Sequence, residues 1–201
     1  MCRKSIKKKL EPRLADAQAG KRAVFFVDAA HVVFGAFLGY LWCFARCWSK
    51  APSGRQRFNV LGALHAITHE VSTVTNFTYI NAERVCQLLR KLGALGLQGP
   101  ITLVLDNARY QRCARGQAVA DTLGIELLSL PAYSPNLNLI ERLWKCVKKQ
   151  CLYSKYYTDF SAFTSAIEDC LAQTQTTHKH ALSSLLTLNF QSFRKAQSLT
   201  M

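Results

Sequence analysis

Three acidic residues occur at positions where a carboxylate could take part in a reaction. Asp28 ends the apolar run Ala-Val-Phe-Phe-Val-Asp, and Asp106 ends the run Ile-Thr-Leu-Val-Leu-Asp. Such runs are typical of buried strands, and an acid at the end of a parallel strand lies at the sheet edge where open α/β sheets bind ligands. If the two strands are parallel neighbours, both carboxylates project into one cleft. Glu141, the third acid, follows a turn rich in Pro and Asn and lies at the start of a predicted helix.

Clustered carboxylates favour a divalent metal, because without a cation they repel one another. Mg²⁺ and Mn²⁺ prefer hard oxygen ligands. Two such ions about 3.5–4 Å apart can activate a water molecule and stabilise the leaving oxygen during phosphodiester cleavage. The sequence therefore predicts Asp28, Asp106 and Glu141 as catalytic residues and as ligands of two Mg²⁺ (or Mn²⁺) ions.

Each acid also has a purely structural interpretation. Asp28 and Asp106 could each end a strand in an Asx turn. The run Asn138-Leu-Ile-Glu141 is typical of a capping box, and a pair between Glu141 and Lys145 would add about 0.3–0.5 kcal/mol. Taken one at a time, these interpretations are the simpler ones. The joint occurrence of two acids at strand ends and one at a helix start favours the metal site.

The elements that must position these acids divide the chain into an arm and one domain. Residues 1–22 hold eight Lys or Arg against two acids, a local net charge of +6. We expect a frayed, solvated N-terminal arm there, and such an arm is compatible with phosphate contacts. Residues 23–195 are predicted to form a single α/β domain.

Strands dominate the first half of that domain, and helices and strands alternate in the second. The predicted strands are 23–28, 37–44, 57–64, 70–79, 101–106 and 125–130. The predicted helices are one capped by Asn81, two at about 109–122 and 138–152, and one from Asp159 to about 173. The order β-β-β-α-β-α-β-α, which has one strand fewer than these six strand segments, predicts a mixed five-stranded sheet with flanking helices.

The composition indicates a polyanionic partner. The 201 residues include 26 Lys or Arg and 12 Asp or Glu, a net charge of +14, which favours nucleic acid over an acidic membrane and disfavours an ordinary metabolic enzyme. An apolar content of 49% excludes wholesale disorder. The eight cysteines form no C-x-x-C pair and are expected to be reduced thiols of a cytosolic protein. The longest apolar run, residues 32–45, is shorter than a membrane span.

Basic residues near the three acids are candidates for phosphate contacts. Lys145 and Lys148 share a helix face with Glu141 at i+4 and i+7, and further arginines flank a turn at Gly54 or follow Asp106. A solvated charged face would explain the same lysines. The candidate DNA-binding residues are Arg55, Arg57, Arg109, Arg112, Lys145 and Lys148.

The sequence around the acids resembles a known family. The motifs are Phe-Phe-Val-Asp28-Ala-Ala-His, Val-Leu-Asp106-Asn-Ala-Arg-Tyr and Tyr-Ser-Pro-Asn-Leu-Asn-Leu-Ile-Glu141-Arg-Leu-Trp. They resemble the D, D and E motifs of DDE transposases, most closely those of the bacterial insertion-sequence-630 / mariner-related group. A separation of 34 residues between Asp106 and Glu141 is common in that group, and the likeness extends from about Leu10 to Phe193.

The resemblance implies an RNase H-like fold that cuts DNA at transposon ends and joins the freed 3′-hydroxyl to target DNA. It also implies a homodimer when active, acting in the bacterial cytoplasm at the nucleoid. Ala29 stands where many relatives have an acid, and Gln111 where many have His. Since full-length relatives begin with helix-turn-helix domains, the chain resembles the catalytic half of a transposase. An RNase H-like nuclease and an inactive transposase fragment remain alternatives.

Overall fold

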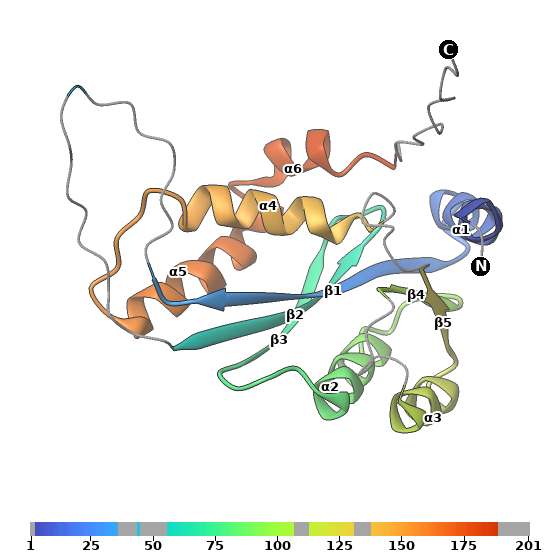
Figure 1. Cartoon of the computed structure of the whole chain (residues 1–201). Coiled ribbons are helices and arrows are strands. Elements are labelled where there is room, and N and C mark those ends of the chain that lie inside the picture. The colour runs from blue at the N-terminus through green and yellow to red at the C-terminus, as the bar shows by residue number, and fades with distance from the viewer. Residues whose placement is uncertain (1–2, 36–43, 45–55, 107–112, 131–137, 189–201) are drawn as a thin grey trace, which may run out of the picture.

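A mixed sheet of five strands forms the centre of the protein (Figure 1). The computed structural model describes residues 3–35, 44, 56–106, 113–130 and 138–188, with side chains from Lys8 onward. The strands lie in the order β3-β2-β1-β4-β5, with β1, β2 and β3 antiparallel and with β4 and β5 parallel to β1. Their bounds are β1 Ala23–Val33, β2 Arg57–His65, β3 Val71–Asn76, β4 Ile101–Leu105 and β5 Ile125–Ser129.

The sheet confirms the predicted mixed, five-stranded arrangement, with two differences in detail. β1 does not end at Asp28 as predicted but continues to Val33. The reason is that β1 keeps pairing with β2 as far as Val33 opposite Arg57, whereas its parallel pairing with β4 stops at Val27. The strand predicted for residues 37–44 lies outside the described residues except for Phe44, which is not part of a strand.

Helices cover both faces of the sheet, because its strands bury alternate side chains on opposite sides. Phe26 packs into the core on one face of β1, and Phe25 and Val27 pack into the core on the other. The helices are α1 Arg3–Gln18, α2 Ala82–Gly93, α3 Ala114–Thr122, α4 Ile140–Cys151, α5 Phe160–Ala172 and α6 Lys179–Leu185, with a short 3₁₀ turn at Gln173–Gln175. Figure 1 shows α2 and α3 on one side of the sheet and α4, α5 and α6 on the other. None of the described helices is long and apolar enough to cross a membrane.

Two helix starts confirm the predicted caps. The side chain of Asn81 accepts a hydrogen bond from the Arg84 backbone N–H at 3.1 Å, and Asp159 accepts one from Ala162 at 2.8 Å. Each bond satisfies a backbone donor that the first turn of a helix leaves without a partner. Apolar residues at i, i+3, i+4 and i+7 form one face of α2, and this face is buried: Val85, Leu88, Leu89 and Leu92.

The expectation of a frayed, solvated arm at residues 1–22 is wrong. Residues Arg3–Gln18 form the helix α1, and its side chains Leu10, Leu14 and Ala17 are buried in the same core as Phe26. These three residues lie at i, i+4 and i+7, which places them on one helix face. The many charges of the segment hide this short apolar stripe in the sequence.

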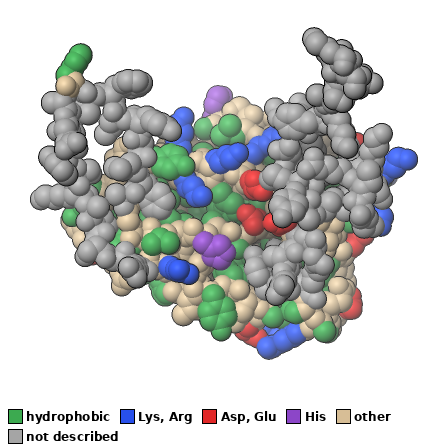
Figure 2. Space-filling model, in the orientation of Figure 1, with side chains coloured by type: hydrophobic (Ala, Val, Ile, Leu, Met, Phe, Trp, Pro, Cys, Tyr) green, Lys and Arg blue, Asp and Glu red, His purple; other side chains and the backbone are tan. Residues whose placement is uncertain are grey.

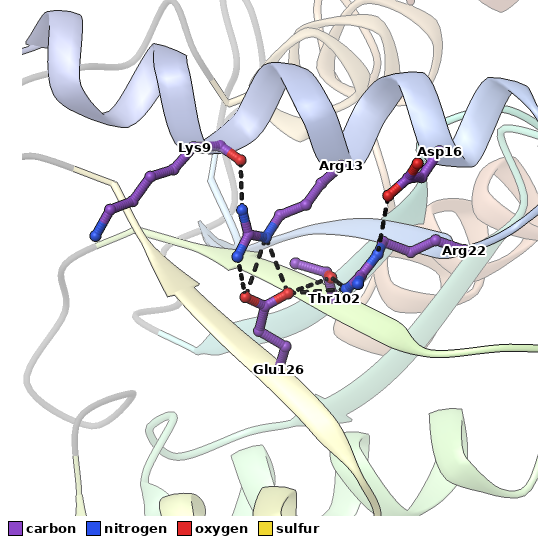
Figure 3. Close-up of polar contacts among 6 residues, drawn as sticks. All are labelled: Lys9, Arg13, Asp16, Arg22, Thr102 and Glu126. Carbon is purple, nitrogen blue, oxygen red and sulfur yellow. Dashed lines mark hydrogen bonds and ion pairs between the residues drawn. The ribbon is translucent and has the colours of Figure 1, made fainter.

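A network of partly buried ion pairs at the edge strand β5 also fixes α1 to the sheet (Figure 3). Glu126 of β5 accepts hydrogen bonds from the Nε of Arg13 at 3.0 and 2.9 Å, and from Arg22 Nη1 at 2.9 Å. Thr102 of β4 donates to the same carboxylate at 2.9 Å. The hydrogen bonds from Arg13 are the main cause that lowers the pKa of Glu126 to about 2. The N-terminal segment is therefore an integral part of this fold.

Candidate active site

Asp28 and Asp106 lie side by side on neighbouring parallel strands. Val27 of β1 is paired with Leu105, the last residue of β4. The residues that follow these two are the acids Asp28 and Asp106. The carboxyl end of β4, rather than of β1, therefore brings the two acids together. Asp28 is half-buried and Asp106 is exposed. The condition stated from the sequence, that the two strands are parallel neighbours, is therefore met.

Both acids lie on the sheet face that α4 covers. On β1, Asp28 lies on the same face as Val24 and Phe26, because alternate residues of a strand share a face. Val24 and Phe26 belong to the core shared with α4. Asp106 follows β4 and is two residues after Val104, which belongs to the same core, so the alternation of the strand places both on this face. The two carboxylates therefore emerge on one side of the sheet, as the sequence predicts.

Glu141 faces this pair from the first turn of α4. The helix packs against β1 and β2, and the Glu141 side chain is half-buried. The alternative interpretation of Glu141 as part of a capping box is wrong. The residue that caps α4 is Leu139, without a side-chain hydrogen bond, and the amide of Asn138 instead donates to the carbonyl of Val27 at 3.4 Å.

The charges of the other acids contribute to the raised pKa of Asp28 and of Glu141. The pKa of Asp28 is raised to about 6, chiefly by burial; the nearby charges of Asp106 and Glu141 contribute to the rise, and a backbone N–H of Ala29 and the Trp144 indole oppose it. Burial also raises the pKa of Glu141, with Lys145 opposing and Asp106 adding to the effect. The described surroundings therefore leave part of the negative charge without compensation.

The chemistry of this group fits a hard divalent cation. Three carboxylates whose charges repel one another are the ligands that Mg²⁺ or Mn²⁺ would take. Nowhere in the described ranges do three His, Cys, Asp or Glu side chains already lie close enough to hold one ion. The three acids therefore supply the ligand chemistry of such a site, but their side chains do not already surround one ion.

Trp144 is a site residue that the sequence does not predict. Its periodicity places it on the core face of α4, and it is indeed 7% exposed. However, its indole Nε1–H also donates a hydrogen bond to Asp28 Oδ2 at 3.2 Å. A buried indole usually requires an acceptor for its N–H, so a Trp one turn after a candidate ligand is a signal that could have indicated this contact.

Three of the candidate DNA-binding residues can be placed. Lys145 is exposed and Lys148 is half-buried on α4, and Arg57 is exposed at the start of β2. Figure 2 shows acidic side chains near the middle of one face of the molecule and basic side chains beside them over α4. Arg55, Arg109 and Arg112 lie outside the described residues, as does Gln111.

The region with this geometry matches a known family model. A model described as DDE superfamily endonuclease matches residues 23–164, which includes all three acids. The chain belongs to the DDE superfamily endonuclease family. A curated relative of this DDE endonuclease chain is the "Insertion element IS630 uncharacterized 39 kDa protein" of Shigella sonnei, which is 24% identical over 135 residues. That match covers 66% of this chain and 39% of the relative, so the chain corresponds to less than half of the relative's length.

Solved structures show that the DDE endonuclease chain has an RNase H-like fold. The Mos1 transposase paired-end complex matches with a TM-score of 0.61 and 14% identity, over 94% of this chain and 62% of the other. The Mos1 transposase catalytic domain matches with a TM-score of 0.58 and 13% identity, over 94% of this chain and 95% of the other. The HTLV-2 integrase catalytic core matches with a TM-score of 0.50 and 15% identity, over 77% and 86%. The predicted fold class is confirmed.

Proposed function

We propose that this chain is the catalytic domain of a transposase that cuts DNA at element ends and joins the freed ends to target DNA. The observation that carries the proposal is that Asp28 and Asp106 follow paired residues of β1 and β4, and that the charges of Asp106 and Glu141 both act on Asp28, within a chain of the DDE endonuclease family. The similar solved structures include a Mos1 transposase complex with a transposon end and a Mos1 strand transfer complex.

The three acids would hold two Mg²⁺ or Mn²⁺ ions. Bound there, the ions would supply Lewis-acid stabilisation of the phosphate and a lowered pKa for the attacking water. Two of the similar structures are a Mos1 paired-end complex with Mn and a Mos1 catalytic domain with Mg, which agrees with this choice of metal. Asp28 and Asp106 would hold the ions from the rigid sheet, and Glu141 would do so from α4.

Basic residues around the acids would hold the DNA backbone. Lys145 and Lys148 continue along α4 from Glu141, so a phosphate chain could run along this helix beside the proposed metal site. Arg57, Arg55, Arg109 and Arg112 complete the proposed set of phosphate contacts. Contacts of this kind carry affinity but no sequence information.

The partners of the chain would be transposon-end and target DNA, with two copies of the chain acting together. Complete transposition joins two ends, and one of the similar structures is titled as a dimeric integrase core. In a bacterium, a protein with this partner would act in the cytoplasm, at the nucleoid. The net charge of +14 agrees with a DNA partner.

Metal-dependent cleavage of a labelled DNA duplex tests the proposed function. The purified chain should cut duplex DNA in the presence of Mn²⁺ or Mg²⁺, and Asp106→Asn and Glu141→Gln should each lower the rate by at least about 100-fold, because an outer contact of a metal site alone is worth 10–100-fold. Asp169→Asn provides a matched control, since it removes an exposed acid of α5 away from the site.

The choice of substrate distinguishes the proposal from an RNase H-like nuclease. A transposase domain should prefer duplex DNA over an RNA–DNA hybrid, and it should join cut ends to a second duplex. Preferential cleavage of the hybrid would replace the proposal with a ribonuclease. Cleavage of DNA at the wild-type rate by Asp106→Asn would contradict the assignment of the site.

A further inference from the structure

The indole of Trp144 connects α4 to one oxygen of Asp28. Trp144 lies three residues after Glu141, so a single turn of α4 carries a proposed metal ligand and a hydrogen-bond donor to another. The distance from the indole Nε1 to Asp28 Oδ2 is 3.2 Å. This bond engages one of the two carboxylate oxygens of Asp28, and a backbone N–H of Ala29 also donates to the carboxylate.

Gly62 makes room for this indole. In the antiparallel pairing of β1 with β2, Gly62 lies directly opposite Asp28. A Cβ at position 62 would lie 2.8 Å from two ring carbons of Trp144, Cη2 and Cζ2, and 3.1 Å from the Cδ1 of Ile140. These distances are shorter than ordinary van der Waals contact, so a side chain at position 62 would displace the indole. A glycine inside a strand often marks such a close approach.

Asn138 provides a second polar contact between the same two elements. Its amide donates to the carbonyl of Val27, the residue before Asp28. Asn138 and Trp144 therefore bond to β1 on either side of Glu141 in the sequence. The effect of both contacts is to fix the start of α4, and with it Glu141, relative to Asp28.

We propose that Trp144 is a positioning residue that orients the Asp28 carboxylate for the metal, and that Gly62 is the cradle that lets the indole reach it. The inference rests on the proposed function of Asp28 as a metal ligand. A Trp that served only to fill the core would be replaceable by another large aromatic residue, because only the N–H distinguishes these roles. The fixed carboxylate needs less reordering when it meets a cation, which strengthens metal binding.

Calorimetric titration of Mn²⁺ into the purified chain tests the inference. Trp144→Phe keeps an aromatic ring and removes the donor, and Gly62→Ala keeps the donor and displaces the ring. Both variants should bind Mn²⁺ about 10-fold more weakly, the low end of the roughly 10–100-fold cost of losing an outer contact. Gly35→Ala is the matched control, because a Cβ there would meet only a backbone oxygen at 3.9 Å. Circular dichroism and thermal unfolding without metal establish that each variant folds.

A second readout follows the hydrogen bond itself. The chain has three tryptophans, so a protein labelled with ¹⁵N at tryptophan gives three indole N–H signals, and the one lost in Trp144→Phe belongs to Trp144. That signal should move when Mg²⁺ is added and in Asp28→Asn.

The outcomes separate this inference from the proposed function. If the wild type binds Mn²⁺ and Asp28→Asn does not, while folded Trp144→Phe binds it as tightly as the wild type, the positioning role is wrong and the metal site stands. If the wild type does not bind Mn²⁺, or if Asp28→Asn binds it equally well, both the proposed function and the inference are wrong. An indole signal that ignores both Mg²⁺ and Asp28→Asn would also overturn the inference.

Discussion

At the level of one residue, Asp28 occupies a position that suits a metal ligand and that costs the folded protein stability. Its carboxylate is half-buried between β2 and α4, and two further acids act on it. The hydrogen bond from Trp144 and a backbone N–H from Ala29 offset only part of this cost, because the pKa of Asp28 remains raised to about 6. A residue that contributed only to stability would not hold a charge in such surroundings.

Replacing this charge should therefore stabilise the protein without metal. At pH 7 we expect Asp28→Asn to raise the free energy of unfolding by on the order of 1–2 kcal/mol, since Asn removes the buried charge and its oxygen can still accept from Trp144. For a chain of this size, the midpoint of thermal unfolding would rise by roughly 2–6 °C. Mn²⁺ should stabilise the wild type and leave Asp28→Asn unchanged. Asp169→Asn, the exposed control, should show neither effect. A lower midpoint for Asp28→Asn would contradict this account of the site.

At the level of the elements, sequence patterns predict what is local and miss what depends on distant partners. The caps at Asn81 and Asp159 are predicted because a side chain and the next turn of the same helix make them. The extension of β1 to Val33 depends on pairing with β2, more than 20 residues later, and so a run of apolar residues cannot show it.

The candidate site shows the same division. The apolar runs before Asp28 and Asp106 indicate the two positions, and the parallel pairing of β1 with β4, which the sequence leaves as a condition, brings the acids together. The hydrogen bond from Trp144 does not follow, because helical periodicity says that this residue is buried and not what its N–H meets. The need for Gly62 appears only when β2 and α4 are packed together.

The packing of β2 against α4 makes a quantitative prediction. Gly62→Ala should lower the free energy of unfolding by about 1–3 kcal/mol, the usual cost of overpacking a core. In a Trp144→Phe background the cost should fall by about 1 kcal/mol or more, because Phe lacks the ring atoms that the new methyl group would meet. Part of the cost should persist, since Ile140 also lies near position 62. Urea unfolding of the four proteins in this cycle measures the coupling. Costs that simply add would mean that the glycine and the indole do not share this space.

At the level of the whole molecule, α1 and the ion pairs of Glu126 join the N-terminal segment to β5, the last strand in the sequence. Glu126 lies on β5, and Arg13 and Arg22 come from the N-terminal segment. In a chain with a net charge of +14, an acid between two arginines reduces the repulsion between neighbouring cations. The buried side chains Leu10 and Leu14 then leave Lys8 and Lys9 of α1 on the surface of the domain.

The pH dependence of stability tests this connection. The pKa of Glu126 is lowered to about 2 in the folded protein, chiefly by the hydrogen bonds from Arg13. An acid with a lowered pKa contributes stability that is complete above its pKa in the unfolded chain, about 4.5, and that is lost as the pH falls toward 2. We expect Glu126→Gln to lower the free energy of unfolding at pH 6–7 by about 1 kcal/mol, a modest value because the carboxylate is partly exposed and screened by solvent. The difference from the wild type should then shrink steadily between pH 4.5 and 2, and high salt should reduce it at pH 7.

Denaturant unfolding across this pH range measures the difference, with Glu168→Gln on the exposed side of α5 as the control. If the difference stayed constant with pH, or if Glu168→Gln gave the same difference, the ion pairs of Glu126 would not be what holds α1 on the sheet, and burial of its leucines alone would have to do so.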